Sequence, residues 1–279
     1  MTLHAPILPP DAGAILAGAL PVMGPLPQDA LCLAAMGHDA QLCAVAVAEE
    51  LRQEPGLDAK GCGAYLVNRL GWSLGRALAA MDLSGRDMTS LDPAGIGFVT
   101  ELKQDIHEGQ PYVYLDTKVT VSPCHDGATL PAPELARLYE MLFTPMIAGV
   151  SAACTLGPGA LWRLVTDGIA LGYLSIGQDC GRQQPAIARA EAILKQPGTR
   201  LYARQLNFLE VTLTPDESPT GAAISDTFRE RAGCCRYYTT ARSEGTYCST
   251  CIHRKDRAER LRLALLHRAR LAAGLSGLV

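Results

Sequence analysis

The sequence predicts a helix-dominated α+β protein, in which a helical main domain with a short sheet precedes a small cysteine-rich C-terminal appendix. Hydrophobic residues make up 48% and charged residues 19% of the 279-residue chain, proportions typical of a folded globular protein. Aromatic residues are scarce at 5%, whereas Ala, Leu and Gly are abundant, which favours aliphatic helices packed closely through small residues. The sequence has no internal repeat of the kind that builds solenoids or propellers.

Apolar residues recur at three- and four-residue steps along several segments, the spacing of one helix face. The predicted helices cover residues 30–51, 63–81, 134–150, 160–176 and 185–195. The uncharged run Met141–Trp162 is 22 residues long, enough to cross a bilayer, but proline and glycine interrupt it. We therefore expect two buried helices joined at Gly157-Pro158-Gly159.

Extended structure is expected in two segments. Residues 112–121 alternate β-branched or aromatic side chains with polar ones after a Gly-Gln-Pro turn, and residues 201–213 form a second candidate. The opening, through about Pro27, lacks a sustained period and is expected to be an irregular arm.

A polar, turn-prone stretch from Thr214 to Gly221 indicates a domain boundary near Thr220. The prediction is a mainly helical domain over residues 1–219 and a segment over 220–279 that contains the cysteine group and a basic helix.

The net charge of −3 conceals an asymmetry. Residues 229–270 contain eleven Lys or Arg against four Asp or Glu, so the remainder of the chain carries about −10. Such a positive end attracts an anionic ligand or an acidic partner, while nucleic acid is not expected as a partner. Ten cysteines without a recognisable secretory signal favour reduced thiols and a cytoplasmic location.

Four of the ten cysteines, Cys234, Cys235, Cys248 and Cys251, fall within eighteen residues. Thiolates are soft ligands, and four of them can hold one zinc ion or two bridged irons. Zinc sites usually pair two Cys-x-x-Cys turns, whereas adjacent cysteines in extended chain point to opposite sides. This favours an iron-sulfur cluster and leaves structural zinc as the alternative.

The other cysteines are expected to have no ligand role. Cys32, Cys43, Cys62 and Cys154 lie in apolar helical runs, where a free cysteine behaves as a small hydrophobe, and Cys124 and Cys180 lie in expected loops.

The paired Cys234-Cys235, the basic and aromatic stretch after it and the closing Cys248-x-x-Cys251 resemble the C-terminal signature of the FhuF family of ferric-siderophore reductases. The resemblance covers the last fifty residues closely and, more loosely, the central helices LYEMLFTPMIAGV and LWRLVTDGIALGYL. It implies a 2Fe-2S cluster on these four cysteines that reduces a ferric siderophore and releases Fe(II). The twelve residues from Arg236 to Tyr247 make a longer loop than the family usually has.

The resemblance also implies a ferric siderophore as substrate and an electron donor such as a ferredoxin or a flavoprotein reductase. No catalytic residue beyond the cluster is expected, because outer-sphere electron transfer needs no general acid or base. Arg236 and Arg242 are candidates for contacting an anionic chelate or only solvate the surface, and Tyr237 and Tyr238 are candidates for covering the cluster. Peripheral association with the inner face of the membrane is left open. The alternative function is a non-enzymatic binding or scaffold protein stabilised by zinc on the same cysteines.

Overall fold

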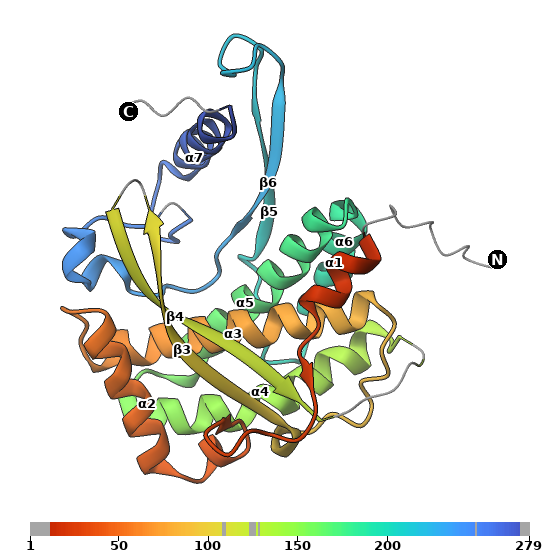
Figure 1. The fold of residues 1–279 in the computed structure, drawn as a ribbon, viewed down its shortest axis with the longest axis vertical. Helices are drawn as coiled ribbons and strands as arrows, with labels where there is room; N and C mark the ends of the chain where they lie inside the picture. Colours follow the sequence, from red (N-terminus) through yellow and green to blue (C-terminus); the bar gives the residue numbers. More distant parts are fainter. Residues whose placement is uncertain (1–11, 108–109, 123–126, 128, 249, 274–279) are drawn as a thin grey trace.

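The computed structural model describes residues 12–107, 110–122, 127, 129–248 and 250–273, and these form a helix-dominated α+β fold (Figure 1). This is the predicted fold class. The helices are α1 (Ala12–Ala19), α2 (Ala40–Gln53), α3 (Ala59–Leu83), α4 (Ala132–Cys154), α5 (Pro158–Asp179), α6 (Gln183–Leu194) and α7 (Arg257–Ala272).

Glycine allows α3 and α5 to pack with their backbones in contact. A Cβ atom on Gly168 of α5 would lie 2.5 Å from the backbone of Gly71 on α3, and one on Gly172 would lie 2.6 Å from the carbonyl oxygen of Gly75. Real Cβ atoms do not approach so closely, so these positions accept no side chain without separating the helices. The predicted packing of helices through small residues is confirmed here.

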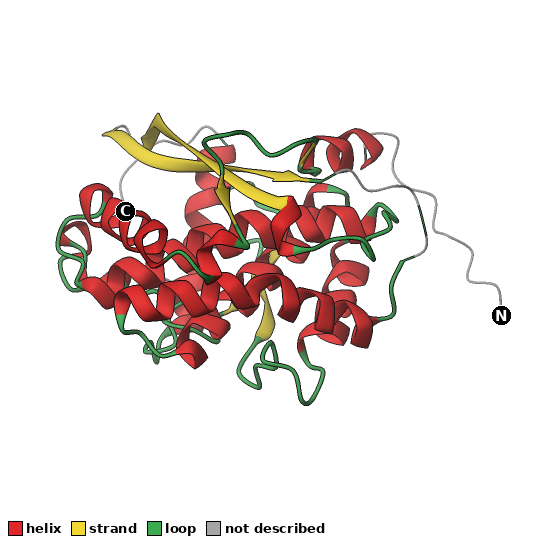
Figure 2. Ribbon diagram, turned by 90° about the horizontal axis from the view of Figure 1, so that it is seen from below, coloured by secondary structure: helices red, strands yellow, loops and turns green. Residues whose placement is uncertain are grey.

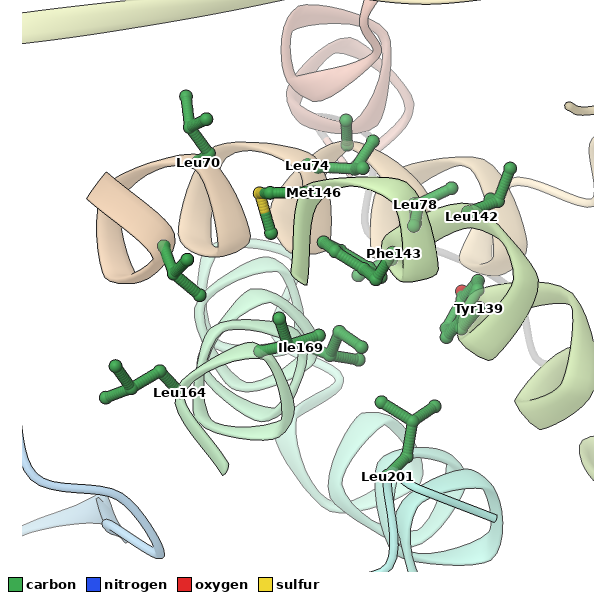
Figure 3. Packing of buried hydrophobic residues seen from close by; sticks show 14 of the residues in the cluster. Leu70, Leu74, Leu78, Tyr139, Leu142, Phe143, Met146, Leu164, Ile169 and Leu201 are labelled. Atoms are coloured by element: carbon green, nitrogen blue, oxygen red, sulfur yellow. The ribbon is translucent and has the colours of Figure 1, made fainter. Parts of the chain in front are cut away.

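A third helix, α4, completes the main core. Figure 3 shows Leu70, Leu74 and Leu78 of α3, Phe143 of α4 and Ile169 of α5, which are fully buried and belong to one hydrophobic cluster. Burying each such side chain contributes roughly 1.5–3 kcal/mol before the loss of chain entropy is counted.

One buried polar network interrupts this apolar core. The Tyr139 and Tyr173 hydroxyls are 3.0 Å apart, Tyr173 donates to Asp82 at 2.6 Å, and Arg189 pairs with the same carboxylate at 2.8 Å. Every member is partnered, as buried polar groups must be. The network links α3, α4, α5 and α6.

The two helices expected within and beyond the uncharged run are confirmed. Helix α4 ends at Cys154, Thr155 adopts a left-handed conformation, and α5 begins at Pro158. Within the described residues, no helix is both long enough and apolar enough to cross a bilayer.

The main sheet contains β1 (Val22–Met23), β2 (Leu31–Cys32), β3 (Ile96–His107) and β4 (Gln110–Val121), in the order β1-β4-β3-β2. The strand predicted over residues 112–121 is confirmed as β4, whereas its antiparallel partner β3 was not predicted. Figure 2 shows the β3–β4 ribbon lying over one side of the helices.

Two predictions for the N-terminal region are wrong. Helix α2 begins at Ala40 instead of residue 30, because the Asp39 carboxylate accepts the Leu42 N–H at 2.9 Å and caps the helix. Before it, Leu31 and Cys32 pair with β3. The expected irregular arm contains α1, whose Ala12, Leu16 and Ala19 are buried against the main core.

A second, smaller core lies at the C-terminal end. Strands β5 (Asn207–Leu213) and β6 (Ile224–Glu230) pair in antiparallel fashion, and Figure 1 shows this hairpin extending from the helical body with α7 beside it. We call this unit the satellite core; its buried residues are Val211, Leu213, Leu261 and Leu265. The extended segment predicted from residue 201 begins only at Asn207. The predicted domain boundary near Thr220 falls in the connection between β5 and β6. The division of the chain into two domains there stays a prediction.

Candidate metal centre

A buried carboxylate fixes the chain just before the cysteine pair. Asp167, in the middle of α5, is fully buried and accepts the N–H groups of Ala232 at 2.8 Å and Gly233 at 3.0 Å. These are the two residues before Cys234, so α5 determines where the pair enters the protein. Charge-assisted hydrogen bonds of this kind are among the stronger ones in proteins.

Two buried arginines accompany this carboxylate. Arg229 donates to the Asp167 carbonyl oxygen at 2.5 Å, and Arg231 contacts the Asp167 carboxylate at 3.4 Å and donates to Asn68 at 2.6 Å. The Arg229 Nε atom is buried and has no hydrogen-bond partner within the described part of the chain. Only Arg231 is ion-paired with the Asp167 carboxylate, whereas Arg229 contacts the backbone carbonyl of the same residue. Two buried guanidinium groups thus lie near one carboxylate, which leaves a surplus of buried positive charge.

The pKa values of the two arginines report this environment. Burial lowers the pKa of Arg229 to about 10. Burial also opposes the charge on Arg231, but the thiolate of Cys235 and the Asp167 carboxylate outweigh it and raise the pKa of Arg231 above its usual value. A buried cation is costly unless an anion lies nearby. Negative charge on the cysteines therefore stabilises both arginines.

The backbone around the cysteines forms tight turns. Arg236, directly after the pair, adopts a left-handed conformation with φ 61°, and its N–H donates to the Cys234 sulfur at 3.4 Å. The N–H of Cys251 donates to the carbonyl of Cys248 at 3.0 Å. Hydrogen bonds to sulfur tune thiolate-bound metals, so the turn after the pair suits a ligand role for Cys234.

The four thiols lie close enough to influence one another. A hydrogen bond with Cys248 lowers the pKa of Cys235 to about 5, against the effect of burial and with help from Arg231. The same hydrogen bond raises the pKa of Cys248. Burial raises the pKa of Cys234, and repulsion from Cys235 and Cys251 adds to this effect. Cys235 and Cys251 are buried, and the other two are half-buried.

The four sulfurs do not form a closed ligand shell. Over the described residues, no group of three or more His, Cys, Asp or Glu side chains is placed so that it could hold a metal ion. A centre held by all four sulfurs requires them to move closer together than they lie here. The donor set nevertheless fits an anionic thiolate-bound metal, because the thiols are soft ligands and two buried cations face them.

The segment after the cysteine pair is clamped onto the connection between α2 and α3. The Ala241 N–H donates to the Pro55 carbonyl at 2.8 Å. Gly56 has φ +94°, and a Cβ there would lie 2.9 Å from the Ala241 nitrogen. Glycine is thus required at this position both for its backbone conformation and for the close approach.

The two predicted substrate-binding arginines belong to the same clamp. Arg236 pairs at 2.7 Å with Asp58, the residue that caps α3, and Arg242 pairs at 2.5 Å with Glu54 at the end of α2. Arg242 also lies over the Tyr237 ring, with 5.6 Å between its Cζ atom and the ring centroid. Both arginines therefore hold the segment in place, and their contact with a substrate stays a prediction.

Aromatic side chains gather on the outer side of the segment. Tyr238 contacts Tyr247 with ring centroids 5.3 Å apart, and the His253 ring lies 5.7 Å from Tyr247. Tyr237 instead packs against the main core. Tyr237 and Tyr238 were both expected to cover the cysteines. Only Tyr238 belongs to this aromatic group, and its coverage of the cysteines stays a prediction.

Acidic residues of the neighbouring hairpin pair with many of the basic residues of α7. Arg257 pairs with Glu230 at 3.7 Å, Arg268 pairs with Asp226 at 2.8 Å, and Arg262 pairs with Glu217. The positive end expected from the sequence is thus partly neutralised within the fold, which weakens its attraction for anionic ligands.

Three residues at this site were missed by the sequence analysis: Asp167, Arg229 and Arg231. A signal for the first was present, since Asp167 is the only charged residue between Leu164 and Gln178. Arg229 and Arg231 are two residues apart at the end of a strand, a spacing that directs both side chains to one face. Only the fold shows that this face meets α5.

The remaining cysteines described by the structure include several fully packed thiols. Cys43 donates to the Met36 carbonyl at 3.1 Å, and burial raises its pKa to about 11. Cys62 and Cys154 are buried between α3 and α4. Cys180, expected in a loop, ends α5 and is buried. Cys124 lies outside the described residues.

Comparison with known proteins identifies no relative. No protein-family model, curated protein sequence or solved structure matches the chain.

Proposed function

We propose that the chain is a ferric-siderophore reductase whose 2Fe-2S cluster is held by Cys234, Cys235, Cys248 and Cys251. When bound, the cluster would receive one electron from a ferredoxin or flavoprotein reductase and supply it to the Fe(III) of a siderophore. The iron is then released as Fe(II). The proposal also rests on the resemblance of the cysteine motif to the FhuF family. Its place in the cell is proposed to be the cytoplasm, where such donors and reduced thiols are found.

The observation that carries the proposal is the buried positive charge beside the thiols. Arg229 and Arg231 are buried near a single carboxylate, that of Asp167, and negative charge on Cys235 and Cys248 stabilises the charged form of both guanidinium groups. Buried cations favour a more negative, reduced state of a thiolate-bound centre, because they stabilise the added electron. A zinc ion held by four thiolates is anionic too and would gain from the same cations, so the choice of iron over zinc rests on the resemblance of the cysteine motif.

The chain's own residues have distinct tasks in this proposal. Asp167 positions the backbone that presents the cysteine pair, and the Arg236 N–H donates to one sulfur. Tyr238 keeps its expected task of covering the cluster, and its ring packs edge-on against Tyr247. No side chain has to transfer a proton, since a single electron moves between two iron sites.

The test is anaerobic purification followed by metal analysis and stopped-flow kinetics. We expect about two irons per chain, a red-brown colour that bleaches with dithionite, and reoxidation by a ferric siderophore with an Fe(II) chelator trapping the product. Cys235→Ser should lose or alter the visible spectrum and the siderophore-dependent reoxidation. Cys32→Ser, a half-buried cysteine away from the site, is the matched control and should retain both.

Two results would contradict the proposal in different ways. A colourless protein with about one zinc per chain would favour the second candidate, a zinc-stabilised binding or scaffold protein. That candidate is supported by the clamp between residues 236–242 and the α2–α3 connection, which a structural metal would reinforce. If the protein contains a cluster that no ferric siderophore reoxidises faster than buffer does, the cluster assignment stands but the reductase function is contradicted.

A further inference from the structure

A large cleft lies beside the candidate centre. It has a volume of about 920 Å³ and is lined by α3, β4, the residues before β1 and Arg242 of the cysteine segment. Small-molecule sites usually measure roughly 300–1,000 Å³. The lining of this cleft includes Tyr65, Arg69, Trp72 and Arg76, which recur along one face of α3.

The cleft and the cysteines share a wall. Tyr65 lines the cleft, forms a hydrogen bond with Arg242, and responds to the charge on Cys235. Asn68 also lines the cleft and accepts a hydrogen bond at 2.6 Å from Arg231, which faces the same thiolate. A ligand in the cleft is therefore separated from the cysteine pair only by the side chains of this wall.

Ion pairs neutralise the basic residues that line the cleft. Arg69 pairs with Glu50 at 2.5 Å and donates to the Thr117 hydroxyl, Arg76 pairs with Asp179 at 3.2 Å, and Lys118 pairs with Glu101 at 2.8 Å. Arg242 pairs with Glu54. Because each cation already has a carboxylate, the cleft offers hydrogen-bonding groups without a strong positive field.

The aromatic side chains of the lining give the cleft an apolar component. Tyr65 and Trp72 lie about two helical turns apart on α3, and Tyr114 lines the cleft from β4. Aromatic faces with a few placed polar groups bind ligands that are amphipathic and carry little net charge.

We propose that this cleft binds the ferric chelate, and that it accepts chelates of low net charge in preference to polyanionic ones. The inference rests on the proposed reductase function and adds the site and the charge class of its substrate. A reduced cluster on the four cysteines would supply one electron to the bound Fe(III), giving Fe(II), and no bond to the protein would form. Tyr65 is a positioning residue of the wall that the electron crosses.

Binding can be measured apart from reduction with gallium(III) complexes, because Ga(III) matches Fe(III) in charge and ligand preference but is not reduced. The oxidised, cluster-loaded protein is titrated by calorimetry with a neutral gallium tris-hydroxamate and with a triply anionic gallium tris-catecholate. We expect the neutral complex to bind at least about tenfold more tightly. Equal affinities, or tighter binding of the anion, would overturn the charge preference.

Two variants test the location. Ser73→Trp places a large ring in the cleft from a half-buried position on α3, and Trp72→Ala removes the aromatic face. Each should weaken binding of the neutral complex by at least about tenfold while leaving iron content and the visible spectrum unchanged. Tyr202→Ala, an exposed aromatic outside the cleft, is the matched control and should bind as the unmodified protein does.

The outcomes separate the inference from the function on which it rests. If Ser73→Trp and Trp72→Ala both bind the gallium complex and reduce the ferric complex like the unmodified protein, the cleft is not the site, although the reductase function stands. If the unmodified protein reduces no ferric chelate, the reductase function fails whatever the gallium complexes do.

Discussion

At the scale of single residues, the candidate centre depends on a balance of buried charge that local sequence does not reveal. The Asp167 carboxylate pairs with Arg231 and accepts two backbone N–H groups, and the carbonyl oxygen of the same residue accepts a hydrogen bond from Arg229. Removing one partner of a buried ionic group leaves the others desolvated without compensation. Asp167 should therefore matter more to stability than any surface carboxylate of the chain.

We predict that Asp167→Asn lowers the free energy of unfolding by about 2–4 kcal/mol, because the amide keeps the shape but not the negative charge that two arginines need. The measurement is urea unfolding under anaerobic conditions. The matched control is Asp179→Asn on the same helix, where the carboxylate is 46% exposed and pairs with Arg76, so the loss should stay below about 1 kcal/mol. Similar losses for the two variants would show that Asp167 does not carry the buried charge balance.

At the scale of helices and strands, the long helices follow from sequence periodicity and the strands largely do not. The segments predicted over residues 63–81 and 160–176 correspond to α3 and α5, whose apolar and glycine positions recur on one face. Strand β3 was missed because its stability comes from its partner: Glu101 and Lys103 pair with Lys118 and Asp116 of β4. Glu101 and Lys118 are 17 residues apart, farther than the roughly four to eight residues over which strand alternation is read from sequence.

The ends of helices and the geometry of the site likewise depend on contacts that local sequence does not show. The start of α2 at Ala40 depends on the Asp39 cap and on the pairing of β2 with β3. At the site, the clustering of four cysteines is visible in the sequence, since they are close along the chain. Asp167 is more than sixty residues from Cys234, and only the tertiary fold brings the two regions together.

We predict that Gly172→Ala strongly destabilises the protein, because a Cβ at this position would lie 2.6 Å from the Gly75 carbonyl oxygen and would push α3 and α5 apart. Overpacking of this kind typically costs about 1–3 kcal/mol and occasionally more. Gly159→Ala on the same helix meets nothing within 4 Å and should leave stability unchanged or raise it by up to about 1 kcal/mol. Thermal unfolding of the two variants provides the comparison, and equal melting temperatures would refute close backbone packing of the two helices.

At the scale of the whole molecule, the cysteine segment connects two cores of unequal size. Ala232 and Cys235 are buried with the main helical core, whereas Leu261 and Leu265 are buried in the satellite core of β5, β6 and α7. A small core of this kind has little apolar area to resist local opening. A metal bound by Cys234, Cys235, Cys248 and Cys251 would shorten the connection and hold the two cores together, as bound metals do in other small units.

Removal of the metal should therefore loosen one part of the molecule and spare the other. We predict that the metal-free protein exchanges backbone hydrogens faster over residues 224–251 and α7, while α3 and α5 keep their protection, since their packing through glycine involves no cysteine ligand. Hydrogen exchange with mass spectrometry on the loaded and metal-free forms gives the comparison.

Leu265→Ala is the control, because it opens the satellite core directly and should speed exchange in α7 with the metal content retained. Equal exchange of the two forms over residues 224–251 would mean that the cysteines do not join the cores, and a loss of protection throughout α3 and α5 would mean that the metal supports the whole fold.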